Sequence, residues 1–220
     1  MEAGSVRGPG PATVRSPDPT EGEAARAGWS PADPGPLGLA AFALTTFVLS
    51  MFNAKLVAPT GEPIVLGLAL AYGGLAQLLA GMWEFRTGNT FGAVAFTSFG
   101  AFWLSFWAFV AFYEKGVPEK ERGKAVGLYL IAWGIFTAYM WIASFRTSAA
   151  VNLVFFLLAV TFFLLGIGNA DNPKGALVTA GGYFGIATAA AAWYASFAAV
   201  TNATFGRVVL PVKPLNVTRS

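Results

Sequence analysis

Long uncharged stretches alternate with short charged segments along the whole chain. Six stretches of 21 to 32 residues contain no Lys, Arg, Asp or Glu, and together they hold 146 of the 220 residues. A helix needs about 20 mainly apolar residues to cross a hydrocarbon core of about 30 Å. The pattern therefore predicts six transmembrane segments and excludes a soluble globular protein.

These segments are predicted to be helices, because only helices and closed barrels satisfy backbone hydrogen bonds in lipid. Barrel strands are about 10 residues long and alternate apolar with polar side chains. Residues 154–166 read VFFLLAVTFFLLG and do not alternate. We expect an all-α membrane protein whose helices cover residues 36–57, 64–85, 90–113, 125–145, 149–168 and 175–203.

The chain outside these helices divides into tails and loops. Residues 1–33 are rich in Gly, Pro, Ala, Glu and Arg and show no apolar periodicity, so we predict a disordered N-terminal tail. Residues 34–206 form the predicted six-helix transmembrane domain, and residues 207–220 form a C-terminal tail. Residues 114–124 (EKGVPEKERGK) are expected to be a solvated loop.

Composition narrows the chemistry further. Only 11% of the residues are charged, and the chain has no Cys and no His. It therefore lacks disulfides, thiolate nucleophiles, imidazole ligands and a histidine base. This argues against a hydrolase or redox enzyme and against a cofactor or metal site. The net charge of +3 gives no support for binding to nucleic acid.

The orientation in the membrane follows only weakly from charge. With six helices both termini share one side, which would carry eight Lys and Arg residues against six on the other. Because cytoplasmic loops carry the excess of basic residues, this near-tie slightly favours cytoplasmic termini.

Polar side chains recur on single faces of the predicted helices. If these stripes face one another, they outline a narrow path for a small solute. The alternative is that they form hydrogen bonds between helices, worth about 0.6 kcal/mol each, and both interpretations stay open for any one stripe. Ionisable groups are absent from the predicted helix centres, which disfavours a buried carboxylate relay. The stripes are Phe42, Thr46, Ser50 and Asn53; Gly73, Gln77 and Glu84; and Ser98 with Ser105.

Two stretches go beyond generic membrane composition. Residues 33–42 read DPGPLGLAAF at the start of the first helix, and residues 88–92 read GNTFG after Ala80, Gly81 and Glu84. Together they resemble the acetate uptake transporter family, also called succinate–acetate permeases. Its signatures are N-P-x-P-[LF]-G-L-x-x-F and A-G-x-x-E-x-x-x-G-N-T-F-G. The resemblance covers residues 33–211.

The resemblance implies six helices with cytoplasmic termini and hexamers with a pore in each protomer. It also implies movement of acetate and related short monocarboxylates, sometimes succinate, by proton coupling or through a channel. The family's hydrophobic constriction matches Phe42, Phe99 and Leu158. This chain departs from the family at Phe99, where Tyr is common, and at Asp33, where Asn is usual.

We therefore expect a plasma-membrane transporter or channel for acetate-like acids, with the lipid bilayer and further copies of the chain as partners. The alternative is a membrane sensor or scaffold that acts through its N-terminal tail. An ammonium transporter is less favoured, because ammonium conduction commonly uses pore histidines. The predicted substrate-binding residues are Pro34, Pro36, Leu37, Gly38, Leu39, Phe42, Asn53, Gln77, Asn89, Thr90 and Ser98.

Overall fold

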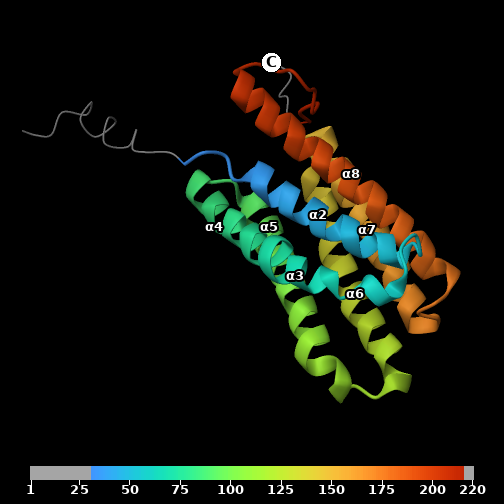
Figure 1. Cartoon of the computed structure of the whole chain (residues 1–220). Helices are drawn as coiled ribbons and strands as arrows, with labels where there is room; N and C mark the ends of the chain where they lie inside the picture. Colours follow the sequence, from blue (N-terminus) through green and yellow to red (C-terminus); the bar gives the residue numbers. More distant parts are fainter. Residues whose placement is uncertain (1–30, 216–220) are drawn as a thin grey trace, which may run out of the picture. The chain divides into compact units, whose positions relative to one another are not determined.

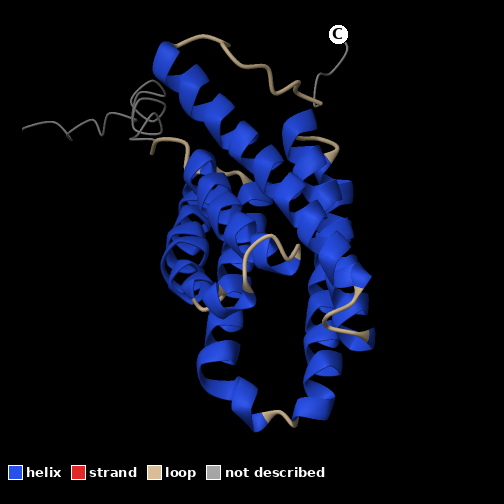
Figure 2. Cartoon of the chain, turned by 45° about the vertical axis from the view of Figure 1, so that its right-hand side comes forward, coloured by secondary structure: helices blue, strands red, loops and turns tan. Residues whose placement is uncertain are grey.

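The computed structural model describes residues 31–215, and six segments within them are long and apolar enough to cross a membrane. The all-α fold class is confirmed (Figure 2). The tail predicted over residues 1–33 lies almost entirely outside the described residues. The spans are α2 (Gly35–Asn53), α3 with α4 (Ile64–Leu70 and Gln77–Thr87), α5 (Thr90–Ala108) with a π-helical turn (Phe109–Tyr113), α6 (Glu119–Ser144), α7 (Ala149–Asp171) and α8 (Ala176–Phe205).

Successive spans are joined by short segments and run in opposite directions (Figure 1). Helix α8 packs along α2 and α7, α6 packs along α7, and α4 packs along α5. We call the end of the bundle where α2 begins and α8 ends the terminal end. The opposite end carries the connections α2–α3, α5–α6 and α7–α8, and we call it the loop end.

The second span is interrupted where a continuous helix was expected. A π-helical turn, Ala71–Ala76, separates α3 from α4. The turn contains Gly73 and Gly74, which are both buried. The sequence pattern gave the length of this span, but apolar periodicity does not distinguish a π-turn from a regular helical turn.

Helix α6 begins earlier than predicted. Residues 114–124 were expected to be a solvated loop, but α6 already starts at Glu119, after a 3-10 turn at Glu114–Gly116. Glu119 and Glu121 lie in its first turn, where carboxylates stabilise the positive end of the helix dipole. The alternating charges therefore extend the helix past the membrane instead of forming a loop.

The first span ends four residues before its predicted end at residue 57. Helix α2 stops at Asn53, and Lys55 adopts a left-handed backbone conformation with φ 59°. At the other end of the chain, residues 213–215 pair with the α6–α7 connection, through a bridge of Ser148 with Pro214. Part of the predicted C-terminal tail is thus held against the bundle.

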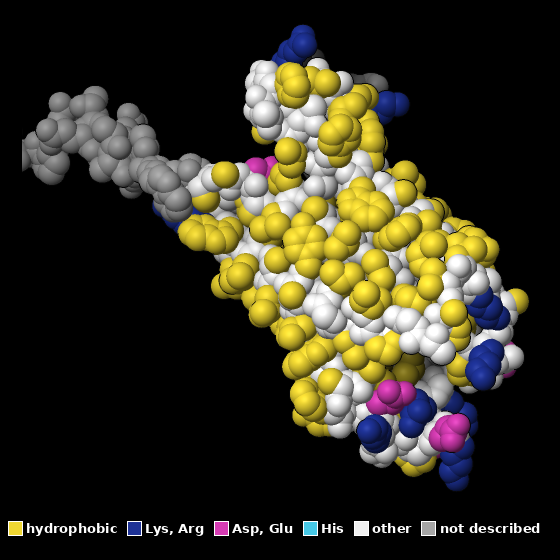
Figure 3. All heavy atoms as spheres, viewed as in Figure 1, with side chains coloured by type: hydrophobic (Ala, Val, Ile, Leu, Met, Phe, Trp, Pro, Cys, Tyr) yellow, Lys and Arg dark blue, Asp and Glu magenta, His cyan; other side chains and the backbone are white. Residues whose placement is uncertain are grey.

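The surface and the interior of the bundle are both apolar. On the face seen in Figure 3, hydrophobic side chains cover the middle, and the visible charged side chains gather toward the ends. This is the distribution that a membrane requires. The buried core is dominated by aromatic rings from α2, α5 and α7, among them Phe42, Phe99, Phe102 and Phe162.

Candidate functional site

Two cavities between the described helices border the predicted constriction, and the larger reaches the loop end. We call it the vestibule; its volume is about 840 Å³. Residues from all three connections at the loop end line its mouth. These are Pro59, Glu62, Pro63, Glu114, Glu119, Arg122, Pro173 and Lys174.

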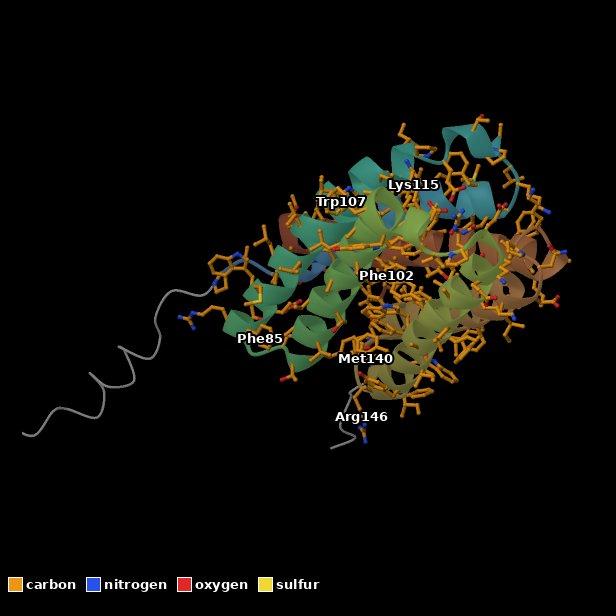
Figure 4. All side chains as sticks on the ribbon, turned by 90° about the horizontal axis from the view of Figure 1, so that it is seen from below. Phe85, Phe102, Trp107, Lys115, Met140 and Arg146 are labelled. Carbon is orange, nitrogen blue, oxygen red and sulfur yellow. The ribbon has the colours of Figure 1, made fainter. Side chains whose placement is uncertain are left out.

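Apolar and hydroxyl side chains line the deeper wall of the vestibule. Tyr129 of α6 and Ser105 of α5 share a hydrogen bond of 2.7 Å between their hydroxyl oxygens, and the Tyr129 hydroxyl also donates to the Phe102 carbonyl oxygen at 3.1 Å. Figure 4 shows Phe102 in the interior of the bundle and Arg146 at its periphery. This contact joins α5 to α6 at the depth of Tyr129.

The smaller cavity, which we call the inner cavity, lies toward the terminal end and has a volume of about 20 Å³. This is room for about one water molecule. No residue of its lining carries a charge, and Gln77 supplies its single polar side chain. The lining consists of Leu39, Phe42, Gln77, Ala95, Phe96, Phe99, Val154, Phe155 and Leu158.

The three residues predicted as a constriction lie together between the cavities. Phe42 and Leu158 line both cavities, and the Phe99 ring, which lines the inner one, lies 5.9 Å from the Phe42 ring. Their exposed fractions are 5% for Phe42, 3% for Phe99 and 4% for Leu158. We call these three residues the neck.

Phe99 is enclosed by other aromatic rings. Its ring centre lies 5.4 Å from that of Phe136, 6.0 Å from that of Phe155 and 6.3 Å from that of Phe162. Edge-to-face and offset arrangements at such distances are favourable for aromatic pairs. These three rings, from α6 and α7, hold the Phe99 side chain in place by packing alone.

Charged groups at the vestibule mouth are partly paired. Arg122 forms an ion pair of 3.2 Å with Glu114, and the Lys55 ammonium donates to the Lys174 carbonyl oxygen at 2.8 Å. Burial against the mouth and then the negative charge of Glu114 raise the pKa of the Glu62 carboxyl above its ordinary value of 4.5. The residue as a whole stays exposed to solvent, so this increase reflects crowding on the side that faces the vestibule.

The start of α2 is held by contacts with the surrounding helices. The Asp33 carboxylate accepts a hydrogen bond of 2.8 Å from the Gly35 amide, and the Pro36 carbonyl oxygen accepts one of 2.7 Å from the Ser196 hydroxyl. A Cβ at Gly38 would lie 2.6 Å from the ring of Phe96, which lines the inner cavity. Asp33 therefore already occupies one of the amide donors at this helix start.

Asn89 has a clear structural role next to this region. Its side-chain oxygen accepts from the Gly92 amide at 3.1 Å, and its side-chain nitrogen donates to the buried Glu84 carboxylate at 3.0 Å. Glu84 also accepts from the Thr87 hydroxyl at 3.0 Å. Asn89 thus caps α5 and ties its start to the end of α4.

Four of the predicted binding residues line a cavity: Leu39, Phe42 and Gln77 border the inner cavity, and Asn53 and again Phe42 border the vestibule. The structure places the others around the terminal end, outside the linings of these two cavities: Pro34, Pro36, Leu37, Gly38, Asn89, Thr90 and Ser98. Leu37 is 45% exposed. Their binding roles stay predictions.

The lining also contains residues that the sequence interpretation did not select. Thr46 follows Phe42 by one helical turn and lines the vestibule, and its position in the polar stripe was the available signal. Phe96, Phe155 and Phe162 lie among many similar aromatic residues. Nothing in the sequence separates them from rings that face lipid.

Comparison with known proteins identifies the family of the chain. The sequence profile described as the GPR1/FUN34/yaaH family matches residues 20–217. Acetate permease A of Emericella nidulans is 42% identical over 195 residues, which are 82% of this chain and 65% of that protein. The succinate-acetate/proton symporter SatP of Escherichia coli is 39% identical over 181 residues, 82% of this chain and 95% of that protein.

One similar protein has a different printed function. Ammonia transport outward protein 2 of Saccharomyces cerevisiae is 45% identical over 179 residues, 78% of this chain. The match covers 62% of that protein, so the chain spans less than two thirds of the length of this relative.

A solved structure has the same arrangement of helices. The bacterial acetate channel SatP matches with a TM-score of 0.76 and 39% sequence identity, over 83% of this chain and 99% of that chain.

Proposed function

This chain belongs to the GPR1/FUN34/yaaH family, and we propose that it carries acetate and related short-chain monocarboxylates across a membrane. The observation that carries the proposal is the neck, which lies between two cavities aligned along the bundle. An apolar constriction discriminates by size and by the cost of dehydration. The names of two relatives, an acetate permease and a succinate-acetate/proton symporter, support the substrate class. Succinate is larger and has two carboxylates, so we rank it below acetate.

The neck and the inner cavity require that a solute shed most of its water. Their linings contain apolar side chains and the single amide of Gln77. A small acid loses few hydrogen bonds on this path, whereas a bulky or multiply charged solute loses many. We therefore propose a transport role without enzymatic activity, and a preference for acids of two carbons over larger ones.

We further propose that the protein lies in the plasma membrane with both termini in the cytoplasm. The vestibule would then open to the outside and the inner cavity would lie toward the cytoplasm. The apolar outer surface leaves room for further copies of the chain, and family resemblance favours a hexamer with one path in each protomer.

Ammonia or ammonium is the second candidate, because one similar protein has that name. The chain contains no histidine, which is the side chain that ammonium conduction commonly uses. The vestibule mouth carries both acidic and basic groups, so it does not concentrate cations strongly. We rank acetate above ammonium for these reasons.

Uptake by proteoliposomes tests the proposal directly. The purified full-length protein is expected to increase uptake of labelled acetate over protein-free vesicles, with competition by unlabelled acetate and weaker competition by lactate. Labelled methylammonium, measured in the same vesicles, tests the second candidate. Uptake of acetate equal to that of protein-free vesicles would contradict the proposed function.

The sensor alternative has its own test. Deletion of residues 2–30 removes the tail on which that alternative depends. A transporter should keep its acetate flux after this deletion, and a loss of flux with normal membrane insertion would favour a role for the tail.

A further inference from the structure

The vestibule is larger and more apolar than a path for acetate requires. Its volume of about 840 Å³ lies within the range of about 300–1,000 Å³ that is typical of cavities that bind whole organic ligands. Such cavities are mostly apolar and contain a few polar groups that orient the ligand. An acetate molecule has a single methyl group, so it leaves nearly all of the apolar wall in contact with water.

One face of α6 lines the vestibule from the mouth inward. Arg122, Val126 and Leu130 follow one another at intervals of four residues and all line the cavity, so they share one side of the helix. Arg122 and Leu130 are eight residues apart, which corresponds to a rise of about 12 Å. Over this distance the wall changes from a charged side chain at the mouth to a buried leucine.

Helices α5 and α7 add apolar side chains to the same space. Phe102 and Phe106 lie one turn apart on α5, and Phe162 and Leu165 belong to α7. The Phe102 ring packs edge-to-face on the Phe162 ring, with the ring centres 5.3 Å apart. Water beside such a wall is displaced favourably by hydrocarbon. The inner part of the vestibule therefore fits an alkyl tail.

Hydrogen-bond donors lie at one side of the vestibule mouth. Lys174 is exposed, Asn53 is partly exposed, and both line the cavity. The Lys55 ammonium also lies here, because it donates to the Lys174 carbonyl oxygen at 2.8 Å. We call these three residues the basic edge. Ammonium and amide N–H groups donate and a carboxylate only accepts, so the basic edge fits a carboxylate.

The acidic side chains of the mouth do not neutralise the basic edge. Among the described residues, the ion pair at the mouth joins Arg122 to Glu114 at 3.2 Å, and neither Lys55 nor Lys174 takes part in one. The negative charge of Glu114 acts on Glu62, so these two carboxylates lie on the side of Arg122. The ammonium groups of the basic edge are therefore available to an anionic ligand.

We propose that the vestibule binds medium-chain monocarboxylates such as octanoate, with the carboxylate at the basic edge and the tail along the apolar wall. The tail supplies most of the binding, and the head group sets the orientation. In this position the acid occupies the route from the mouth to the neck and obstructs the entry of acetate. The binding site goes beyond the proposed function, whereas the obstruction of acetate rests on it.

Binding in lipid nanodiscs tests the site without requiring transport. The full-length protein is placed in phosphatidylcholine nanodiscs, and the labelled octanoate that binds protein-free discs is subtracted. Octanoate is expected to bind saturably, to one site in each chain. Unlabelled butyrate, hexanoate and octanoate should displace it with increasing strength, by about fourfold for each added methylene group. Octylammonium has the same tail and should displace it more weakly than octanoate.

A substitution that fills the inner part of the vestibule tests the position of the tail. Val126→Trp places a large side chain in the lining and should weaken octanoate binding about tenfold, because the tail loses room for several methylene groups. Leu128→Trp is the matched control on the same helix, since Leu128 is 71% exposed and outside both linings. It should not change the binding.

A change of charge tests the position of the head group. Lys174→Gln removes one ammonium from the basic edge and should weaken octanoate binding about threefold, as expected for a pair exposed to solvent. Displacement by uncharged octanol should not change. Lys120→Gln removes the same charge from the first turns of α6, outside the lining, and should leave octanoate binding at the wild-type value.

The outcomes separate the site from the proposed function. Octanoate binding equal to that of protein-free discs, or displacement that does not depend on chain length, would overturn the site in the wild-type chain whatever the variants do. Equal displacement by octylammonium would overturn the role of the basic edge. In proteoliposomes octanoate should inhibit acetate uptake at the concentrations at which it binds. Bound octanoate without inhibition would overturn the obstruction, and absence of acetate uptake beside saturable octanoate binding would overturn the proposed function alone.

Discussion

The inner cavity and the vestibule share Phe42 and Leu158 but differ in size and chemistry. The vestibule has about 840 Å³ and a mouth with charged groups, and the inner cavity has about 20 Å³ and an uncharged lining. A vestibule of this size holds many water molecules, so an acid keeps its hydration there. If acids pass as proposed, they lose that hydration at the neck, so we expect selection at the neck and the inner cavity.

The charges at the vestibule mouth refine this comparison. Three glutamates, an arginine and a lysine belong to its lining. A mouth with this mixture does not concentrate anions strongly. We therefore expect the vestibule to admit small solutes of either charge, whereas the uncharged lining of the inner cavity disfavours ions by the cost of desolvation.

The largest expected effect comes from the helix that both regions share. Helix α2 carries Leu39, Phe42 and Thr46, and its end packs against α8. A Cβ at Gly182 would lie 2.7 Å from the Ala54 Cα atom. Because this atom belongs to the backbone, it cannot move aside as a flexible side chain could. We expect Gly182→Ala to destabilise the protein by about 2 kcal/mol, seen as a lower thermal midpoint in detergent.

The matched control for this change is Gly67→Ala in α3, where a Cβ would meet nothing within 4 Å. It should leave the midpoint unchanged or raise it slightly, because alanine favours a helix by up to about 1 kcal/mol over glycine. Equal midpoints for Gly182→Ala and Gly67→Ala would show that the α2–α8 contact is not tight.

The second prediction concerns the width of the neck. Leu158→Ala removes side-chain volume where the two cavities meet and should raise the ratio of lactate to acetate uptake about tenfold. Leu49→Ala makes the same change in the wall of the vestibule, away from the inner cavity. Its ratio should stay at the wild-type value. A ratio that responds equally to both substitutions would place selection outside the neck.

The six spans and the neck followed from the sequence by different routes. Uncharged stretches of more than 20 residues gave the spans by length alone. Phe42, Phe99 and Leu158 came from family resemblance, since nothing in the local pattern distinguishes Phe99 from Phe102 or Phe106. The structure places these three residues together, although their roles in transport stay predictions.

The remaining details depend on contacts that a single sequence does not encode visibly. The π-turn before Gln77 depends on the close approach of Gly74 to α5. The unpaired state of Thr46, next to the self-paired Thr45, depends on the face that each side chain takes in the assembled bundle. Both features require neighbouring helices, and helical periodicity reports only one helix at a time.

A smaller effect is expected from restoring the family's hydroxyl at the neck. Phe99→Tyr adds a donor beside the inner cavity, and one hydrogen bond contributes about 1 kcal/mol. Acetate uptake should therefore rise up to about fivefold, while the uptake of lactate does not rise. Phe106→Tyr, which adds the same hydroxyl to the vestibule wall, is the control and should not change uptake. An increase in both variants would assign the effect to general polarity.

The smallest effect concerns stability at the vestibule mouth. The pKa of Glu62 is higher in the folded chain than its ordinary value of 4.5, so the folded state binds this proton more tightly than the unfolded state. The resulting stabilisation is complete below pH 4.5 and is lost as the pH rises through the higher, folded pKa. We expect the thermal midpoint of the wild type to fall between pH 4.5 and neutral pH as this stabilisation is lost, and Glu62→Gln should make that fall smaller. Because Glu62 is exposed to solvent, salt should weaken the effect, and Glu119→Gln controls for the loss of one carboxyl from the same mouth. If the thermal midpoint of Glu62→Gln changes with pH just as that of the wild type does, the protonation of Glu62 does not contribute to stability.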